Sequence, residues 1–311
     1  MRKVPALRPG DTIGFIAPSS PTPRKQLERS IEITESLGFN VVVGESCYAS
    51  WGYLAGPDDL RAGDVNRMFG DPSVKGIFCV RGGDGATRLP ERIDMPLLRN
   101  NPKVFLGYSD VTVLHLMILK EAGFCTFHGP MPSTEFVKDT FEGYVKDSFL
   151  RALMDTEPLG EILPYEGAPP MRGLVPGVAE GEIVGGCLAL ICALLGTPWE
   201  IDTRGKILVF EDVNEEPYRI DRMLCSLRMA GKLRDAAAIV VGQIEKAEAK
   251  DPEKSLTLEE VWQSHLANLE KPVLLGGCFG HGVKKATLPL GARARVDASK
   301  EIFSLLESGV Y

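Results

Sequence analysis

Apolar and polar positions follow two different rhythms along the chain. In the first half, short apolar runs alternate with amphipathic segments. The alternation predicts strands at 12–17, 40–44, 76–80 and 104–107, and helices at 24–37, at 58–69 and directly after Ser109. Strands that alternate with helices are typical of a mainly parallel sheet covered by helices. We therefore expect an α/β domain over residues 1–154.

The pattern changes between residues 155 and 180, where proline and glycine become frequent. Such a stretch is typical of an interdomain linker. Beyond it, the apolar runs predict strands at 181–186, 206–210, 237–242 and 272–276, a helix at 188–195 and a hairpin-like ending over 286–306. These elements indicate a second domain of mixed α and β structure over residues 181–311.

Composition narrows the class of protein. With 311 residues, of which 44% are hydrophobic, the chain can bury the cores of two domains. A net charge of -7 and the lack of a basic block argue against nucleic acid as a partner. The first residues lack the apolar core of a signal peptide, and no apolar run is long enough to span a bilayer. We expect a cytoplasmic protein that does not bind membranes.

The seven cysteines indicate no metal site. They are scattered, mostly inside apolar runs, and no spacing gives a Cys-x-x-Cys pair or a His/Cys zinc pattern. We expect reduced thiols, most of them buried.

Ser109 stands where a short apolar strand turns abruptly into an apolar helix. A serine at such a junction can project its hydroxyl above the carboxyl edge of a sheet, beside N–H groups of the new helix that can stabilise an oxyanion. The simpler interpretation is that Ser109 or Asp110 caps the helix. A nucleophilic serine also needs a base, and an acid that orients the base, from elsewhere in the chain.

Four histidines are candidates for the base. His115 lies among apolar residues and is predicted to belong to the core, and His265 is predicted to lie on a helix surface. His128 and His281 each follow an apolar strand and precede glycine, which suits the sheet edge where open α/β folds bind ligands. The spacing does not choose between these two, and a turn histidine bonded to a backbone carbonyl explains either one equally well.

Glu211 and Asp212 follow directly on the strand predicted at 206–210. A carboxylate at the end of a buried strand is costly unless it has a partner, and an imidazole N–H is a suitable partner. The alternative is a solvated acidic turn, because Glu215 and Glu216 follow at once.

The turn at 81–87 offers flexible backbone whose N–H groups can approach a negative ligand. Arg88 stands where a Gly-x-Gly-x-x-Gly motif has its last glycine, so the motif for a dinucleotide is incomplete. We expect no cofactor.

Several of these segments also form a recognisable set. They are 10–20, 53–56, 81–83, 107–112, 128–131, 185–186, 211–224 and 280–282. Gly-Tyr-Ser-Asp at 107–110 and Glu-Asp-Val…Tyr-Arg-Ile-Asp-Arg at 211–222 are specific in combination. Along nearly its whole length the chain resembles the LD-carboxypeptidase family of serine peptidases, which includes muramoyltetrapeptide carboxypeptidases and microcin C self-immunity hydrolases.

The resemblance implies roles for individual residues. Ser109 would be the nucleophile, His281 the general base and Glu211 the residue that orients the histidine, so that His128 becomes a structural residue. The backbone N–H groups of Asp110 and Gly83 would form the oxyanion hole. The implied fold is α/β, with a flavodoxin-like N-terminal domain that carries the serine, a C-terminal mixed α/β domain that carries the acid and the histidine, and the active site in the cleft between the domains.

The resemblance also implies a reaction. It suggests a homodimer that releases terminal D-alanine from cytoplasmic murein tetrapeptides during cell-wall recycling, through an acyl-enzyme. The alternatives are a microcin C immunity-type hydrolase of acyl-nucleotide phosphoramidates or sulfamoyl adenylates, with Trp51 or Trp199 stacking on the base, and a non-catalytic protein that binds a peptide or nucleotide.

Substrate-binding residues are harder to assign. A carboxypeptidase must hold a free carboxylate, and the candidates are Arg81, Arg88 and Arg219. Asp84 and Cys187 stand where many members of the family have tyrosine and asparagine. Both positions are therefore candidates for lining the pocket.

Overall fold

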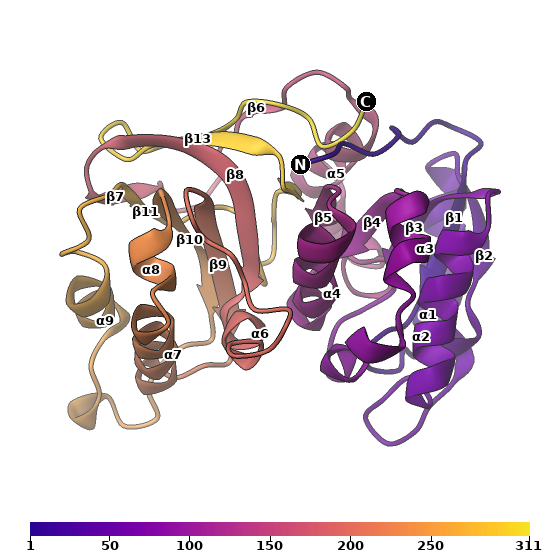
Figure 1. The fold of residues 1–311 in the computed structure, drawn as a ribbon, viewed down its shortest axis with the longest axis horizontal. Helices are drawn as coiled ribbons and strands as arrows, with labels where there is room; N and C mark the ends of the chain where they lie inside the picture. The colour runs from indigo at the N-terminus through magenta and orange to yellow at the C-terminus, as the bar shows by residue number, and fades with distance from the viewer. The chain divides into compact units, whose positions relative to one another are not determined.

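A computed structural model describes residues 1–311 and divides them into two compact units (Figure 1). The N-terminal unit comprises residues 1–157, 286–291 and 308–311, and the C-terminal unit comprises residues 158–285 and 292–307. The chain first passes from the N-terminal unit to the C-terminal unit after residue 157, close to residue 154, where the N-terminal domain was expected to end. Two short C-terminal segments, in contrast, return to the N-terminal unit.

The N-terminal unit is built on a six-stranded sheet in the order β12-β5-β4-β3-β1-β2. Strands β1 to β5 are parallel, in the flavodoxin-like order, and β12 joins β5 in antiparallel register. The strands are β1 (Thr12–Ile16), β2 (Asn40–Val43), β3 (Val74–Cys79), β4 (Val104–Gly107), β5 (Thr126–His128) and β12 (Leu288–Leu290). The helices are α1 (Arg24–Ser36), α2 (Asp58–Gly70), α3 (Met95–Asn100), α4 (Thr112–Met117) and α5 (Tyr144–Met154).

Burial explains why the central strands of this unit are almost continuously apolar. Every residue of β4 is buried, as is every residue of β3 except Lys75. A parallel strand covered on both faces needs apolar side chains on both faces, which is the pattern in the sequence. The strands and helices predicted in this half are all present, with ends that differ by one or two residues.

The C-terminal unit is built on an eight-stranded sheet in the order β6-β14-β13-β8-β9-β10-β11-β7. Its strands are β6 (Gly160–Glu161), β7 (Arg172–Val175), β8 (Val178–Cys187), β9 (Ile207–Val213), β10 (Ala238–Glu245), β11 (Val273–Leu275), β13 (Arg293–Asp297) and β14 (Ile302–Leu305). The helices are α6 (Leu188–Ala193), α7 (Pro217–Met229), α8 (Lys232–Asp235) and α9 (Leu258–His265). Strands β8 to β11 are parallel, and the flanking strands are antiparallel.

Strand β8 joins the two halves of this sheet. Figure 1 shows it as a long curved strand, whose first residues pair with β13 and whose last residues pair with β9. The hairpin expected at the end of the chain is present as β13 and β14, but β12, which precedes it, belongs to the other sheet. The expected linker at 155–180 contains β6 and β7, so most of it is part of the C-terminal unit.

Short turns of 3₁₀ or π helix complete both units, at Glu45–Tyr48, Ala86–Arg88, Pro90–Arg92, Ser109–Val111, Ile118–Ala122, Pro132–Phe136, Asp139–Phe141 and Pro252–Lys254. None of the chain's helices combines the length and the apolar character needed to cross a bilayer.

Candidate active site

Ser109 occupies a strained turn between β4 and α4. Its φ of 65° lies in the left-handed region, which only three other non-glycine residues of the chain enter. A serine in this conformation costs about 1–2 kcal/mol, and such strain is concentrated at functional sites. Neither Ser109 nor Asp110 caps α4, whose N-cap residue is Val111. The helix-cap interpretation is therefore wrong, and the strand–turn–helix geometry is compatible with a nucleophile elbow.

Two buried groups hold the strand end that precedes this turn. The carbonyl oxygen of Gly107 lies 2.9 Å from Nε2 of His115 and accepts the N–H of Gly129 at 3.2 Å. His115 is completely buried, and burial lowers its pKa to about 4, so the ring is neutral at physiological pH. The prediction that His115 is a core residue is confirmed.

Two glycines let the turn at 81–83 approach Ser109. A Cβ on Gly82 would lie 2.9 Å from Cβ of Ser109. Gly83 has a φ of 120°, and a Cβ there would lie 2.2 Å from Oγ of Ser20. The N–H of Gly83 donates to no acceptor in the protein, and the N–H groups at the start of a helical turn have no partner within the helix. Main-chain donors with the chemistry of an oxyanion hole therefore lie beside the serine.

Asp110 ties these two turns together. Its Oδ2 accepts the N–H of Ala86 at 2.8 Å. Burial raises the pKa of Asp110 to about 6. Because the side chain holds the turn after β3 while the backbone belongs to the turn after β4, Asp110 sets the spacing of the two groups of main-chain donors.

A buried arginine that was not predicted from the sequence also lies in the N-terminal unit. Arg61 of α2 is completely buried and donates to the carbonyl oxygens of Pro18 and Gly85, the latter at 2.9 Å. A signal was present, because Arg61 lies on the same helical face as Val65 and Met68, where a charged residue is unexpected.

In the C-terminal unit, β9 carries a fully buried carboxylate against a histidine. Oε2 of Glu211 lies 2.5 Å from Nδ1 of His281, whose side chain is 14% exposed. A carboxylate on Nδ1 sets the ring orientation and directs Nε2 to the opposite side, where it can act as a base. His281 is one of the two histidines that sequence spacing left open, and it has a buried carboxylate on Nδ1.

Gly280 and the side-chain amide of Gln243 position the loop that carries His281. Gly280 has a φ of 118°, and a Cβ there would lie 2.7 Å from Cβ of Glu211. Gln243, at the end of β10, accepts the N–H of Gly282 at 2.9 Å and donates to the carbonyl of Lys284 at 2.8 Å. Gln243 was not predicted as a site residue, although it directly follows a predicted buried strand, as Glu211 does.

The neighbours of Glu211 have other tasks. Asp212 accepts the N–H groups of Ala189 and Val213, both at 2.8 Å, and burial raises its pKa to about 6. Cys187 is paired in register with Glu211 and is buried, so that desolvation holds the pKa of its thiol well above the usual value. All seven cysteines are free thiols, five of them buried.

The candidate substrate-binding arginines already have partners. Arg81 donates to the carbonyl oxygens of Pro21 and Gly82, at 3.0 and 3.2 Å. Arg88 pairs with Asp58, with 2.8 Å between Nε and Oδ1. Arg219 lies over the ring of Tyr218, with 5.7 Å from Cζ to the ring centroid. Asp84 is exposed, and its N–H donates to Oγ of Ser20 at 3.1 Å.

His128, the other candidate for the base, is buried in β5. Its ring packs edge-on against Tyr108, with 5.7 Å between the ring centroids. This surrounding is that of a packed residue beside the serine turn.

Two family models match the chain. The model of the LD-carboxypeptidase N-terminal domain matches residues 13–129, and that of the LD-carboxypeptidase C-terminal domain matches residues 180–296. The chain belongs to the LD-carboxypeptidase family. Members of this family are serine peptidases, so the sequence-based assignment is confirmed.

Three similar proteins show the range of this family. The chain is 44% identical over 308 residues to a probable murein peptide carboxypeptidase of Bacillus subtilis (strain 168), covering 99% of this chain and 95% of the relative. The structure of muramoyltetrapeptide carboxypeptidase from Oxalobacter formigenes is 30% identical, with a TM-score of 0.83, and 94% of this chain and 97% of that one are covered. The structure of MccF in complex with glutamyl sulfamoyl guanosine is 25% identical, with a TM-score of 0.91, and both chains are covered completely.

Proposed function

We propose that this LD-carboxypeptidase family member releases the terminal D-alanine of murein tetrapeptides, with Ser109 as nucleophile, His281 as general base and Glu211 as the residue that orients His281. The bond between Glu211 and His281 is the observation that carries the proposal, because a buried carboxylate on Nδ1 is what an acyl-transfer base requires. The 44% identity to a probable murein peptide carboxypeptidase supports the substrate class.

The proposed reaction begins when His281 takes the proton of the Ser109 hydroxyl as the oxygen attacks the amide carbonyl. The N–H groups of Asp110 and Gly83 stabilise the oxyanion, and His281 then protonates the leaving D-alanine. Water, activated by the same histidine, hydrolyses the acyl-enzyme. The proposal requires Oγ of Ser109 to come within hydrogen-bonding reach of Nε2 of His281 during turnover.

The strain at Ser109 supports its role in this reaction. A residue held at positive φ without glycine needs a reason, and projection of a reactive hydroxyl from a sharp turn supplies one. Ser109 belongs to the N-terminal unit, whereas Glu211 and His281 belong to the C-terminal unit. The proposal therefore requires a residue from each unit to take part in one reaction.

Release of D-alanine from a purified tetrapeptide tests the proposal. Ser109→Ala and His281→Ala should each lower turnover by about 10⁴-fold or more, because removal of either member disables the whole constellation. Ser36→Ala, at an exposed serine of α1, is the matched control and should keep wild-type activity. Wild-type turnover in the Ser109→Ala protein would overturn the assignment.

A second candidate function is hydrolysis of acyl-nucleotides of the kind found in the MccF complex. The high structural similarity to MccF favours it, and Trp51, which is 56% exposed, can supply a surface for base stacking. Assay of the tetrapeptide and of glutamyl sulfamoyl guanosine with one enzyme preparation separates the two functions. We expect the higher kcat/KM for the tetrapeptide.

A non-catalytic binding protein is the third possibility. A serine-directed phosphonate distinguishes it, because only an activated hydroxyl reacts readily. We expect labelling at Ser109 that His281→Ala abolishes. An unlabelled wild-type protein that binds the tetrapeptide would support the binding function instead.

We also propose that the enzyme acts in the cytoplasm, in cell-wall recycling, as a homodimer. Cell fractionation and light scattering of the purified protein test the location and the oligomeric state.

A further inference from the structure

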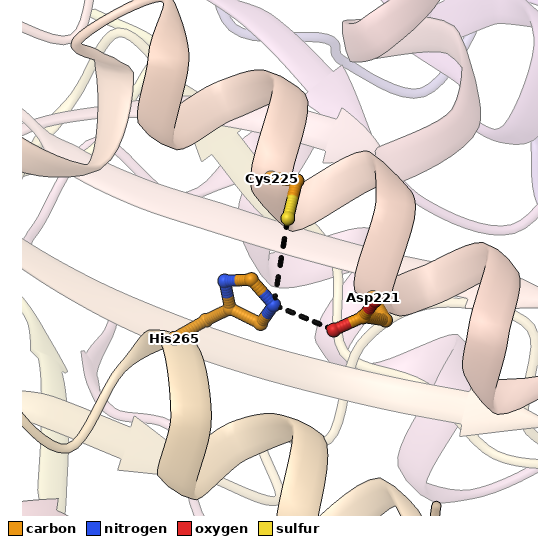
Figure 2. Close-up of side chains that lie close together, drawn as sticks. All are labelled: Asp221, Cys225 and His265. Carbon is orange, nitrogen blue, oxygen red and sulfur yellow. Dashed lines mark hydrogen bonds and ion pairs between the residues drawn. The ribbon is translucent and has the colours of Figure 1, made fainter. Parts of the chain in front are cut away.

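A second group of reactive side chains lies on the helices of the C-terminal unit. Asp221 and Cys225 are four residues apart on α7, so they share one face of the helix, and His265 is the last residue of α9. Figure 2 shows all three side chains converging, with the carboxylate and the thiol both directed at the same ring nitrogen. Nε2 of His265 lies 2.7 Å from Oδ1 of Asp221 and 3.9 Å from Sγ of Cys225.

His265 is buried, with 8% of its surface exposed, so the prediction of a helix-surface histidine is wrong. The side chain turns inward because α9 packs against α7. The capping box of Thr257 and Glu260 defines where α9 begins. Cys225 is half-buried, and the side chain of Asp221 is 38% exposed. The cluster is therefore shielded on the side of His265 and accessible on the side of Asp221.

We propose that Asp221, Cys225 and His265 form a binding site for a divalent transition metal ion, with zinc as the best fit. Imidazole nitrogen, thiolate sulfur and carboxylate oxygen are the three ligand types that zinc takes in proteins. Calcium and magnesium, which take oxygen ligands, do not suit a site with sulfur and nitrogen.

Two of the three distances between the ligand atoms are close to those of a tetrahedral site, and all three ligand atoms lie within 4.8 Å of one another. With zinc bonds of about 2.0–2.3 Å, tetrahedral angles require about 3.6 Å between nitrogen and sulfur and about 3.4 Å between nitrogen and oxygen. The present distances of 3.9 and 2.7 Å differ from these by less than about 1 Å. Rotation of the part-exposed Asp221 side chain is enough to open the nitrogen–oxygen distance.

Hydrogen bonding alone explains this arrangement less well. Nε2 carries at most one proton, which it can donate to the carboxylate of Asp221 but not at the same time to the thiol of Cys225. A metal ion at the point where the three groups meet uses all of them at once.

A fourth ligand can reach the ion from solvent. Asp221 lines a cavity of about 430 Å³ together with Val261 of α9. The other lining residues are Glu216, Tyr218, Ala249, Lys250, Asp251, Lys254, Ser255 and Leu256. Water or an anionic group in this cavity can complete the tetrahedron. The bound ion would link α7 to α9 and stabilise the C-terminal unit.

Cobalt and zinc titration of the chelator-treated full-length protein tests the site. Cobalt should give a thiolate charge-transfer absorption at one ion per chain, and zinc should displace it. Cys225→Ser should abolish this absorption and weaken zinc binding by at least about 10-fold. Cys192→Ser, at another half-buried cysteine outside the cluster, is the matched control and should behave as wild type. Zinc at about 100 times its Kd should raise the Tm of the wild type by about 5 °C.

A second variant keeps the test valid if Cys225→Ser folds poorly. Asp221→Asn changes a part-exposed side chain, and it should weaken zinc binding while it leaves the circular dichroism of the metal-free protein unchanged. Equal zinc affinity in the wild type and both variants would overturn the proposal, as would absence of the cobalt–thiolate absorption from the folded wild-type protein.

Discussion

The two units hold their candidate catalytic residues by different means. In the N-terminal unit, Ser109 is held by main-chain geometry, with a positive φ and a glycine turn packed against its Cβ. In the C-terminal unit, His281 is held by a side chain, the buried carboxylate of Glu211. A nucleophile and an oxyanion hole depend on backbone position, whereas a base depends on the charge beside it. Mutations in the two units should therefore lower activity for different physical reasons.

Removal of the carboxylate charge of Glu211, in the C-terminal unit, should have the largest effect on activity. Glu211→Gln keeps the volume of the side chain but removes the carboxylate that orients His281, and kcat/KM for tetrapeptide hydrolysis should fall by about 10⁴-fold. Asp212→Asn, at the adjacent buried carboxylate, should instead leave kcat/KM close to that of the wild type, because the carboxylate of Asp212 bonds to backbone N–H groups and not to the histidine. Equal losses of kcat/KM in both variants would contradict the distinction.

The charge buried in the N-terminal unit should affect stability through pH. Asp110 has a pKa of about 6 when folded and 3.8 when unfolded, so between pH 4 and 6 the native state holds a proton that the unfolded state has released. Stability contributed by this group is therefore present below pH 4 and lost as the pH rises to 6. As the pH rises from 4 to 6, the free energy of unfolding of Asp110→Asn should therefore increase relative to that of the wild type, by up to about 3 kcal/mol.

Urea unfolding at pH 4, 5, 6 and 7 measures this difference. His115 titrates in the opposite sense, because its folded pKa is lowered to about 4, but it is present in both proteins and cancels. A difference between Asp110→Asn and wild type that stays constant with pH would exclude a raised pKa at Asp110.

Backbone clearance in the C-terminal unit should be as important for His281 as its charge partner. Gly280→Ala adds a Cβ that meets Glu211, which displaces the histidine loop, and kcat/KM should fall by about 10²-fold. Gly196→Ala is the control, since Gly196 also has a positive φ but no atom within 4 Å of the added Cβ. It should lose stability without losing activity, and a similar loss of activity there would implicate backbone strain rather than the contact with Glu211.

The smallest expected effect is a difference in stability between two inactive variants of Ser109. This difference measures the backbone strain at Ser109 apart from the loss of its hydroxyl. Ser109→Gly and Ser109→Ala both remove the hydroxyl and should be inactive, but glycine adopts a φ of 65° without steric cost. The glycine variant should unfold with a midpoint that corresponds to about 1 kcal/mol more stability than the alanine variant. Equal stabilities would show that the turn stores little strain.

The sequence alone determined most of the local structure of the N-terminal unit. Hydrophobic periodicity predicted four of the five parallel strands of the N-terminal sheet, and the junction at Ser109 was visible as an apolar strand running directly into an apolar helix. His115 was recognised as a core residue from its apolar neighbours. These features depend on residues close together in the chain, and local pattern reports them directly.

Only the tertiary structure decided which distant groups meet. Four features join segments that are separated by many residues. Glu211 bonds to His281, β12 pairs with β5, Gln243 bonds to Gly282, and His265 turns inward. Periodicity shows that a side chain is buried but not what it is buried against, because register and packing between distant elements choose the partner.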